Sequence, residues 1–126
     1  GYGRTKNMKK VGTRRMTVKI DQPDVPQVND YFLRVNYVAD VAMAFIGGYL
    51  VLDHYYYGIP WTIGLRRFKN ELKNEYLSFY FRPLRKDAPF IGDLPVEAIP
   101  DFSQKDADCL VRSVDVIPEY KAIVNI

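Results

Sequence analysis

The side chains best suited to acid–base chemistry are few in this 126-residue sequence. His54 is the only histidine, and it directly follows Asp53. A carboxylate beside an imidazole can build a general base, but adjacent side chains on a helix point about 100° apart. Because the pair ends an apolar run that we predict to be helical, His54 is expected to be a hydrogen-bonded histidine at an interface.

Cys109 is the only cysteine, which excludes a disulfide-stabilised fold. Nearby Asp106 and Asp108 disfavour the thiolate, so we expect a small buried residue rather than a nucleophile. The sequence has no phosphate-binding glycine loop, no GxSxG and no HExxH motif. We therefore predict that the chain is not an enzyme and that it has no catalytic residues, no metal site and no cofactor.

Charge is distributed in alternating blocks along the chain. Residues 1–20 contain seven Lys or Arg and no acid, residues 21–60 and 87–126 are acidic, and residues 61–86 are basic. Either the blocks contact differently charged surroundings, or they neutralise one another within one fold. The first block can also contact phosphates of RNA. Its candidate RNA-binding residues are Arg4, Lys6, Lys9, Lys10, Arg14 and Arg15.

The segment 31–57 contains an uninterrupted apolar run, from Val41 to Leu52. The run alone is shorter than the roughly 20 residues of a membrane span, and this favours a buried helix. The full segment is long enough to cross. Asp40, Ala44 and Gly48 would lie on one helical face, where small residues let another helix approach and hide the carboxylate from lipid. We predict a helix over 31–57, embedded in a membrane or buried.

A second helix is predicted over 60–82. Apolar residues recur there at helical spacing, and basic residues occupy the other side. Aromatic and basic residues at the end of the first helix and the start of the second suit the boundary between hydrocarbon and headgroups. The predicted membrane-interface residues are Tyr55, Tyr56, Tyr57, Trp61, Arg66 and Arg67.

The two ends of the chain are predicted to be extended. Residues 1–30 indicate a basic arm, a short strand from Met16 to Ile20 and a proline-containing linker. Residues 83–126 contain prolines at spacings of five or six and then one or two short strands, which is typical of an arm that lies on a neighbour. The predicted fold class is mostly α with extended arms, divided into 1–30, 31–82 and 83–126.

These features together predict a non-catalytic accessory subunit of a multi-subunit membrane complex. The mitochondrial inner membrane, with its respiratory chain and ATP synthase, is the expected location, and other subunits and lipid are the expected partners. One alternative is a ribonucleoprotein component, like those of the mitochondrial ribosome, that binds RNA through the basic arm. A second alternative is a small soluble α+β ligand-binding domain or enzyme.

Overall fold

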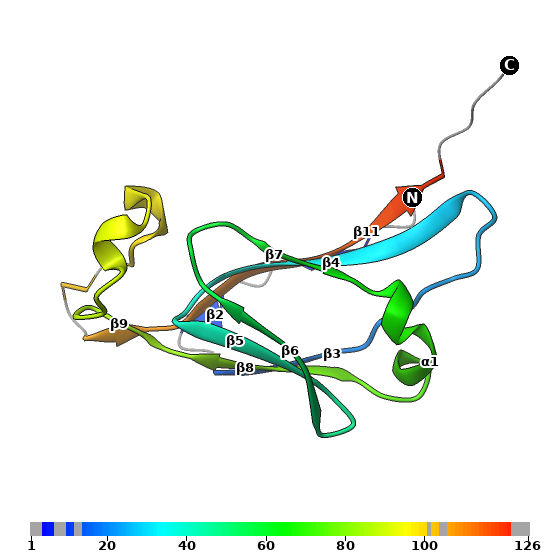
Figure 1. The fold of residues 1–126 in the computed structure, drawn as a ribbon, viewed down its shortest axis with the longest axis horizontal. Coiled ribbons are helices and arrows are strands. Elements are labelled where there is room, and N and C mark those ends of the chain that lie inside the picture. The colour runs from blue at the N-terminus through cyan, green and yellow to red at the C-terminus, as the bar shows by residue number, and fades with distance from the viewer. Residues whose placement is uncertain (1–3, 7–9, 12–13, 101, 104–105, 122–126) are drawn as a thin grey trace, which may run out of the picture.

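The computed structural model describes residues 4–6, 10–11, 14–100, 102–103 and 106–121 (Figure 1). About half of the chain lies in strands and only 12% in helix, so the predicted mostly α fold is wrong. The strands are β1 (Arg4–Lys6), β2 (Lys10–Val11), β3 (Arg15–Val18), β4 (Val28–Val38), β5 (Val41–Ile46), β6 (Tyr49–Tyr55), β7 (Trp61–Gly64), β8 (Leu77–Arg82), β9 (Leu84–Arg85), β10 (Ala107–Asp108) and β11 (Leu110–Tyr120). The short helical elements are η1 (Arg66–Phe68), α1 (Lys69–Leu72), η2 (Ile91–Asp93) and η3 (Val96–Ala98).

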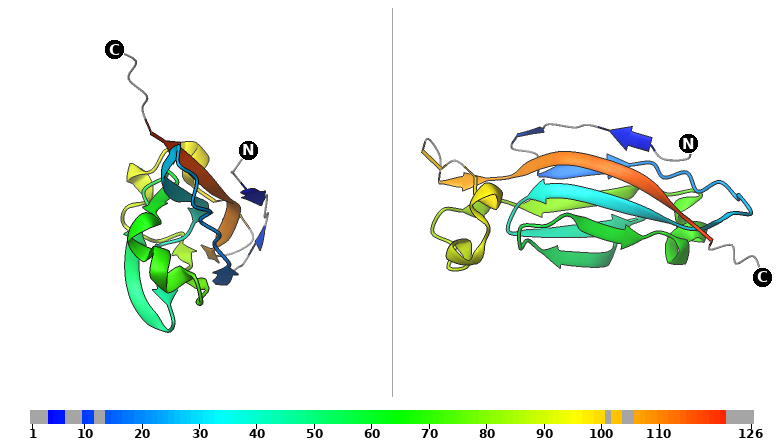
Figure 2. Two further views of the ribbon diagram at one scale, coloured as in Figure 1. Left: turned by 90° about the vertical axis from the view of Figure 1, so that its right-hand side faces the viewer. Right: turned by 90° about the horizontal axis from the view of Figure 1, so that it is seen from above.

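The strands form two main antiparallel sheets. The first has the order β1-β11-β4-β7, with β2 also paired to β11, and the second has the order β3-β8-β5-β6. A small additional sheet pairs β9 with β10. Figure 2 shows β1 and β2 alongside β11, on the side away from β4. The helix α1 lies at one end of the two sheets, and residues 88–100 lie at the other (Figure 1).

One hydrophobic core fills the space between the two sheets. In β4, side chains alternate between buried and less buried positions, the pattern of a strand with one face on a core. Leu33 and Val35 from this strand are fully buried, as is Phe81 from β8 in the opposite sheet. Aromatic rings join the sheets directly, because Tyr37 contacts Phe81 with a centroid separation of 5.4 Å and Trp61 contacts Phe79 at 5.9 Å.

The helix predicted over 31–57 is replaced by most of β4, β5 and β6. Gly47 and Gly48 have φ angles of +56° and +83°, and they connect β5 to β6 in a two-residue turn. Positive φ at both central positions is the geometry that favours a β-hairpin. Asp40, Ala44 and Gly48 therefore share no helical face, since Asp40 lies between β4 and β5, Ala44 is buried in β5 and Gly48 is in the turn.

The helix predicted over 60–82 is also wrong. That segment contains β7, the single turn of α1 and β8. Leu77, Phe79 and Phe81 are buried on one face of β8, while Tyr76, one of the apolar residues that recur at helical spacing in the predicted helix, is exposed. Buried and less buried residues therefore alternate with period two, as in a strand, at the end of this segment. Within the described residues, the structure contains no helix long and apolar enough to cross a membrane.

The predicted extended ends are partly strands of the sandwich. The predicted strand from Met16 to Ile20 is observed as β3, from Arg15 to Val18. The predicted C-terminal arm supplies β11, which pairs with β4 over nearly its whole length. Four residues of the predicted basic arm (Arg4, Lys6, Lys10 and Arg15) lie in β1, β2 and β3, and Arg14 directly precedes β3. Lys9 is outside the described residues.

Oppositely charged blocks of the sequence meet in the fold. Ion pairs join Lys69 to Asp24, Arg82 to Asp40, Lys86 to Asp106 and Arg34 to Asp115. Each of the first three connects the basic block 61–86 to one of the two acidic blocks. Neutralisation within one fold, one of the two alternatives left open by the sequence, thus accounts for part of the charge order.

Candidate functional site

A pocket of about 280 Å³ opens at the end of the sandwich opposite α1. It lies where the β4–β5 turn, the end of β6 and the segment that contains η2 come together. In the part of the chain that the structure describes, its walls are mainly aromatic, with two carboxylates. The lining residues are Asp40, Tyr55, Tyr56, Tyr57, Phe90, Asp93 and Leu94. We call this cavity the aromatic pocket.

Asp40 is fixed in the aromatic pocket by both its backbone and its side chain. Its N–H donates to the Arg82 carbonyl oxygen at 2.8 Å, and its own carbonyl accepts from the Tyr56 N–H at 3.1 Å. Its Oδ2 accepts from Arg82 Nε at 2.9 Å and lies 2.7 Å from Nη2 of the same guanidinium. These bonds tie the β4–β5 turn to the ends of β6 and β8 and hold the carboxylate beside Arg82.

The three consecutive tyrosines have different environments. Tyr56 is buried, and its hydroxyl donates to the Ala98 carbonyl oxygen at 2.8 Å. Burial raises the pKa of Tyr56, although the nearby Arg112 opposes that shift. Tyr55 and Tyr57 are 69% and 55% exposed, so their rings are accessible walls of the pocket. Tyr56 therefore anchors the segment, and its two neighbours face outward.

Gly58 holds the β6–β7 loop against the segment that follows η2. Its φ is +97°, a conformation that side chains disfavour, and a Cβ built there would lie 2.9 Å from Cδ of Pro95. The loop and the 95–98 segment are therefore in close contact, and this contact shapes one edge of the aromatic pocket. Phe90, Asp93 and Leu94 reach the pocket from the adjoining η2 region.

His54 lies between the two sheets, behind the tyrosines. Its ring stacks on Trp61 with a centroid separation of 5.0 Å and an interplanar angle of 7°. Its Nδ1 lies 2.6 Å from the Tyr37 hydroxyl, and burial raises the pKa of that phenol. Asp53, the adjacent residue, is exposed, as expected for successive side chains of a strand. The pair therefore forms no oriented general base.

Because burial lowers the pKa of His54, stability should depend on pH in a defined direction. The unfolded chain, with a histidine pKa of about 6.5, binds the proton more tightly than the folded one. The full stability is therefore present above pH 6.5 and declines as pH falls through about 6.5 toward the lower folded pKa. Thermal unfolding midpoints measured at pH 7.5 and 5.5 should show this decline, and His54→Gln should remove it. An equal decline in the variant would contradict the assignment.

Cys109 is buried, and its Sγ lies 4.0 Å from the Phe81 carbonyl oxygen. Burial, assisted by Asp108, raises the pKa of its thiol to about 11, which keeps it protonated. The structure thus agrees with the expectation of a small buried residue. In the part of the chain that the structure describes, no three His, Cys, Asp or Glu side chains gather as a metal-binding group.

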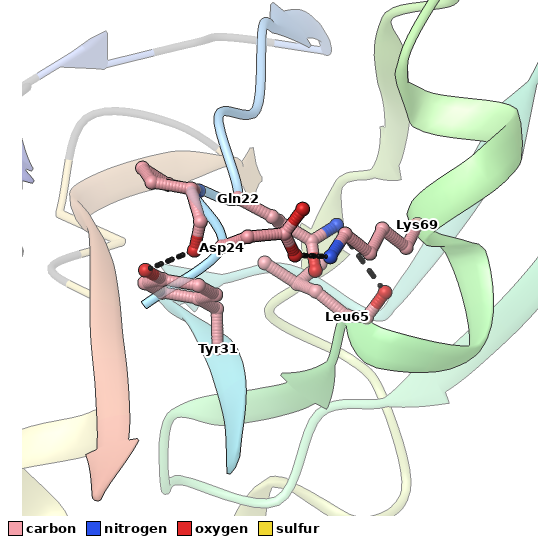
Figure 3. A network of polar contacts seen from close by, with 6 residues as sticks. Gln22, Asp24, Tyr31, Leu65 and Lys69 are labelled. Carbon is pink, nitrogen blue, oxygen red and sulfur yellow. Dashed lines mark hydrogen bonds and ion pairs between the residues drawn. The ribbon is translucent and has the colours of Figure 1, made fainter. Parts of the chain in front are cut away.

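A second pocket of about 400 Å³, with both polar and apolar walls, lies near α1. Figure 3 shows its contacts: Lys69 pairs with Asp24, Gln22 Nε2 donates to the Leu65 carbonyl at 3.3 Å, and the Tyr31 hydroxyl donates to a backbone carbonyl at 2.9 Å. Lys69 holds the pKa of the Asp24 carboxyl below its usual range. These contacts fasten the linker before β4 to α1, so we interpret this pocket as structural.

The structure separates the residues that the sequence grouped at a membrane interface. Tyr55, Tyr56 and Tyr57 line the aromatic pocket, and Trp61 is buried behind them. Arg66 and Arg67 begin η1, next to α1 at the other end of the molecule. The sequence prediction placed Phe90, Asp93 and Leu94 in no site, because Phe90 and Leu94 were visible only as apolar residues between prolines and Asp93 only as an acid expected to be solvated.

The comparisons add no identification. No protein-family model, no curated protein and no solved structure matches the chain.

Proposed function

We propose that this chain is a non-catalytic β-sandwich module that docks onto a protein partner within a larger assembly. The observation that carries the proposal is a set of large apolar side chains that are exposed at one end of the molecule. Tyr55, Tyr57 and Ile59 are 69%, 55% and 52% exposed, and Val96 is 84% exposed. We call these four residues the docking end.

The docking end combines two segments of the chain that meet at Gly58 and Pro95. Tyr57 and Ile59 flank Gly58, which contacts Pro95, and Val96 follows Pro95 directly. Tyr55 and Tyr57 line the same pocket. Exposed apolar residues are ordinary when they are scattered singly, but a connected group that contains tyrosine is typical of the centre of a protein interface.

The side chains that could take part in catalysis have structural roles instead, and this supports a non-catalytic function. His54 is packed between Trp61 and Tyr37, and Cys109 is a buried, protonated thiol. Asp40 is tied to Arg82. Each of these groups has a packing or pairing function that explains its position in the fold.

A protein partner fits the docking end better than a phosphate-bearing one. Of the residues that the structure describes, the two charged ones that line its pocket, Asp40 and Asp93, are acidic, and carboxylates repel the phosphates of RNA and of anionic lipid. RNA binding through Arg4, Lys6, Lys9, Lys10, Arg14 and Arg15 stays a prediction of the sequence, as does location at the mitochondrial inner membrane. Salt-dependent RNA binding and cell fractionation test these two predictions directly.

Site-specific photocrosslinking tests the docking end. A photoreactive phenylalanine analogue is placed at Tyr57 in the protein as it occurs in its cell. The control is Tyr120, which is also 55% exposed but lies at the far end of β11. We expect position 57, and not position 120, to give one discrete crosslinked product.

The same surface should control assembly size. The double variant Tyr57→Ser, Ile59→Ser should sediment more slowly than the wild-type assembly, while its thermal unfolding midpoint stays close to that of wild type because both side chains are exposed. Tyr120→Ser should leave the assembly intact. Equal crosslinking from both positions, or an unchanged sedimentation profile of the double variant, would overturn the proposal.

A further inference from the structure

The aromatic pocket has walls that attract positive charge. The rings of Tyr55 and Tyr57 are largely accessible, while Tyr56 is held in place by its bond to Ala98. Phe90 is half-buried against the core, and Leu94 is buried. The face of an aromatic ring carries negative potential, and it attracts an ammonium or guanidinium group within about 6 Å of the ring centroid.

The two carboxylates of the pocket differ in how far they are neutralised. Asp40 uses Oδ2 for both contacts with Arg82. Asp93 lies in the first turn of η2 and is exposed, and within the described residues its side chain has no ion pair or hydrogen bond. Asp93 therefore contributes a full negative charge at the rim. An incoming cation would meet this charge together with the tyrosine rings.

The positive charges near the pocket do not line it. Arg82 is bound to Asp40, and Arg112 lies close enough to Tyr56 to lower the pKa of that phenol against the effect of burial. Among the described residues, the lining contains no Lys or Arg. The volume of about 280 Å³ lies near the lower limit of ligand pockets, which begin at about 300 Å³, so it suits one long side chain rather than a large cofactor.

We infer that the aromatic pocket binds a lysine or arginine side chain presented by the protein partner. This inference rests on the proposed docking function, and it specifies the chemistry of the contact. The alkyl stem of the side chain would lie along Leu94 and Phe90, and its charged end would lie between the tyrosine rings and Asp93. Such a contact gives the docking end selectivity for a partner with a basic residue at the centre of an apolar surface.

Small probes test the pocket without a partner. The purified 126-residue chain is titrated with N-acetyl-lysine-N-methylamide and N-acetyl-arginine-N-methylamide while its backbone amide NMR signals are recorded. The norleucine analogue, a neutral mimic of lysine, and glycerol phosphate serve as controls. We expect the cationic probes to shift amides of residues 40, 55–57 and 93, with dissociation constants about tenfold or more below that of the norleucine probe.

Variants then assign the binding to named side chains. Asp93→Asn and Tyr57→Leu should each weaken binding of the lysine probe about three- to tenfold. Tyr120→Leu, which changes an equally exposed tyrosine outside the pocket, should leave binding unchanged. The amide spectrum of each variant shows directly whether the fold is kept.

The outcomes separate this inference from the proposed function. Equal binding of the norleucine probe, tighter binding of glycerol phosphate, or no shift with either cationic probe would overturn the inference. If the cationic probes fail while Tyr57→Ser, Ile59→Ser still disrupts the assembly, the docking function stands and its cationic contact does not. If the probes bind while the double variant leaves the assembly intact, the docking function is the part that fails.

Discussion

Replacing Phe81 with alanine is expected to lower the free energy of unfolding by about 3–5 kcal/mol. Phe81 is fully buried in β8 and stacks on Phe79 at a centroid separation of 6.0 Å. Its ring also contacts Tyr37 across the two sheets at 5.4 Å. Removing the ring takes away its own burial and leaves a cavity that both sheets line. Chemical denaturation of the variant and of wild type measures the difference.

Tyr76→Ala is the informative control for Phe81→Ala. A helix over 60–82 would place Tyr76 in its apolar stripe, but the observed fold leaves this residue 54% exposed, with Lys19 over its ring at 5.8 Å. We expect a loss below about 1 kcal/mol for Tyr76→Ala. If Tyr76→Ala were the more damaging change, β8 would not be the strand that carries the core.

Gly58→Ala should be the most damaging change at the docking end, with an expected loss of about 2–4 kcal/mol in the free energy of unfolding. Two effects combine there. The φ of +97° is strained for any residue with a side chain, and the added Cβ would lie 2.9 Å from Cδ of Pro95. The β6–β7 loop must then move away from the 95–98 segment, which should also alter the aromatic pocket.

Gly48→Ala separates these two effects. Gly48 also has a positive φ, +83°, but a Cβ there would have no neighbour within 4 Å. Its expected loss is about 1–2 kcal/mol, from backbone strain alone. Thermal and chemical unfolding of both variants give the comparison. If both variants lose the same stability, the contact between Gly58 and Pro95 contributes nothing.

Some elements were predictable because their signals were local. The alternation of Met16, Val18 and Ile20 correctly predicted β3, and the apolar residues near the C-terminus indicated strands, where β11 is found. The Gly47-Gly48 pair also carried a correct signal, since two glycines between apolar runs favour a tight hairpin. The helix prediction over 31–57 did not use this signal, and the hairpin was therefore missed.

The remaining differences come from tertiary context. The sequence of β5 is a continuous apolar run, because the strand lies between β8 and β6 and most of its residues are buried. A short buried strand and a buried helix segment cannot be told apart by periodicity alone. In the second predicted helix, Leu65, Leu72 and Phe79 are indeed buried, but Leu65 lies between β7 and η1, Leu72 is in α1 and Phe79 is in β8. Their helical spacing is a coincidence of the fold.

The sequence analysis singled out some residues of the candidate site and not the others. Tyr55, Tyr56 and Tyr57 were predicted at a membrane interface, which stays a prediction; in the structure, two of them are exposed and Tyr56 is buried. Asp40 was expected on a helical face, but it reaches the tyrosines through the β4–β5 turn. Phe90, Asp93 and Leu94 lie more than thirty positions further along the chain. They are brought to the pocket by the bond from Tyr56 to Ala98 and by the contact at Gly58, which no local pattern encodes.

The pairing of β11 with β4 constrains how the chain folds during synthesis. Leu110 pairs with Val38 and Tyr120 with Val28, so the central pair of the first sheet joins segments separated by most of the described chain. Pairings this distant in sequence close slowly, because the intervening loop loses entropy before the contacts form. On the ribosome, one edge of β4 has no β11 to pair with until residues 110–120 have emerged. All strands of the second sheet lie within residues 15–82, so that sheet can form first and serve as the template on which the first sheet closes.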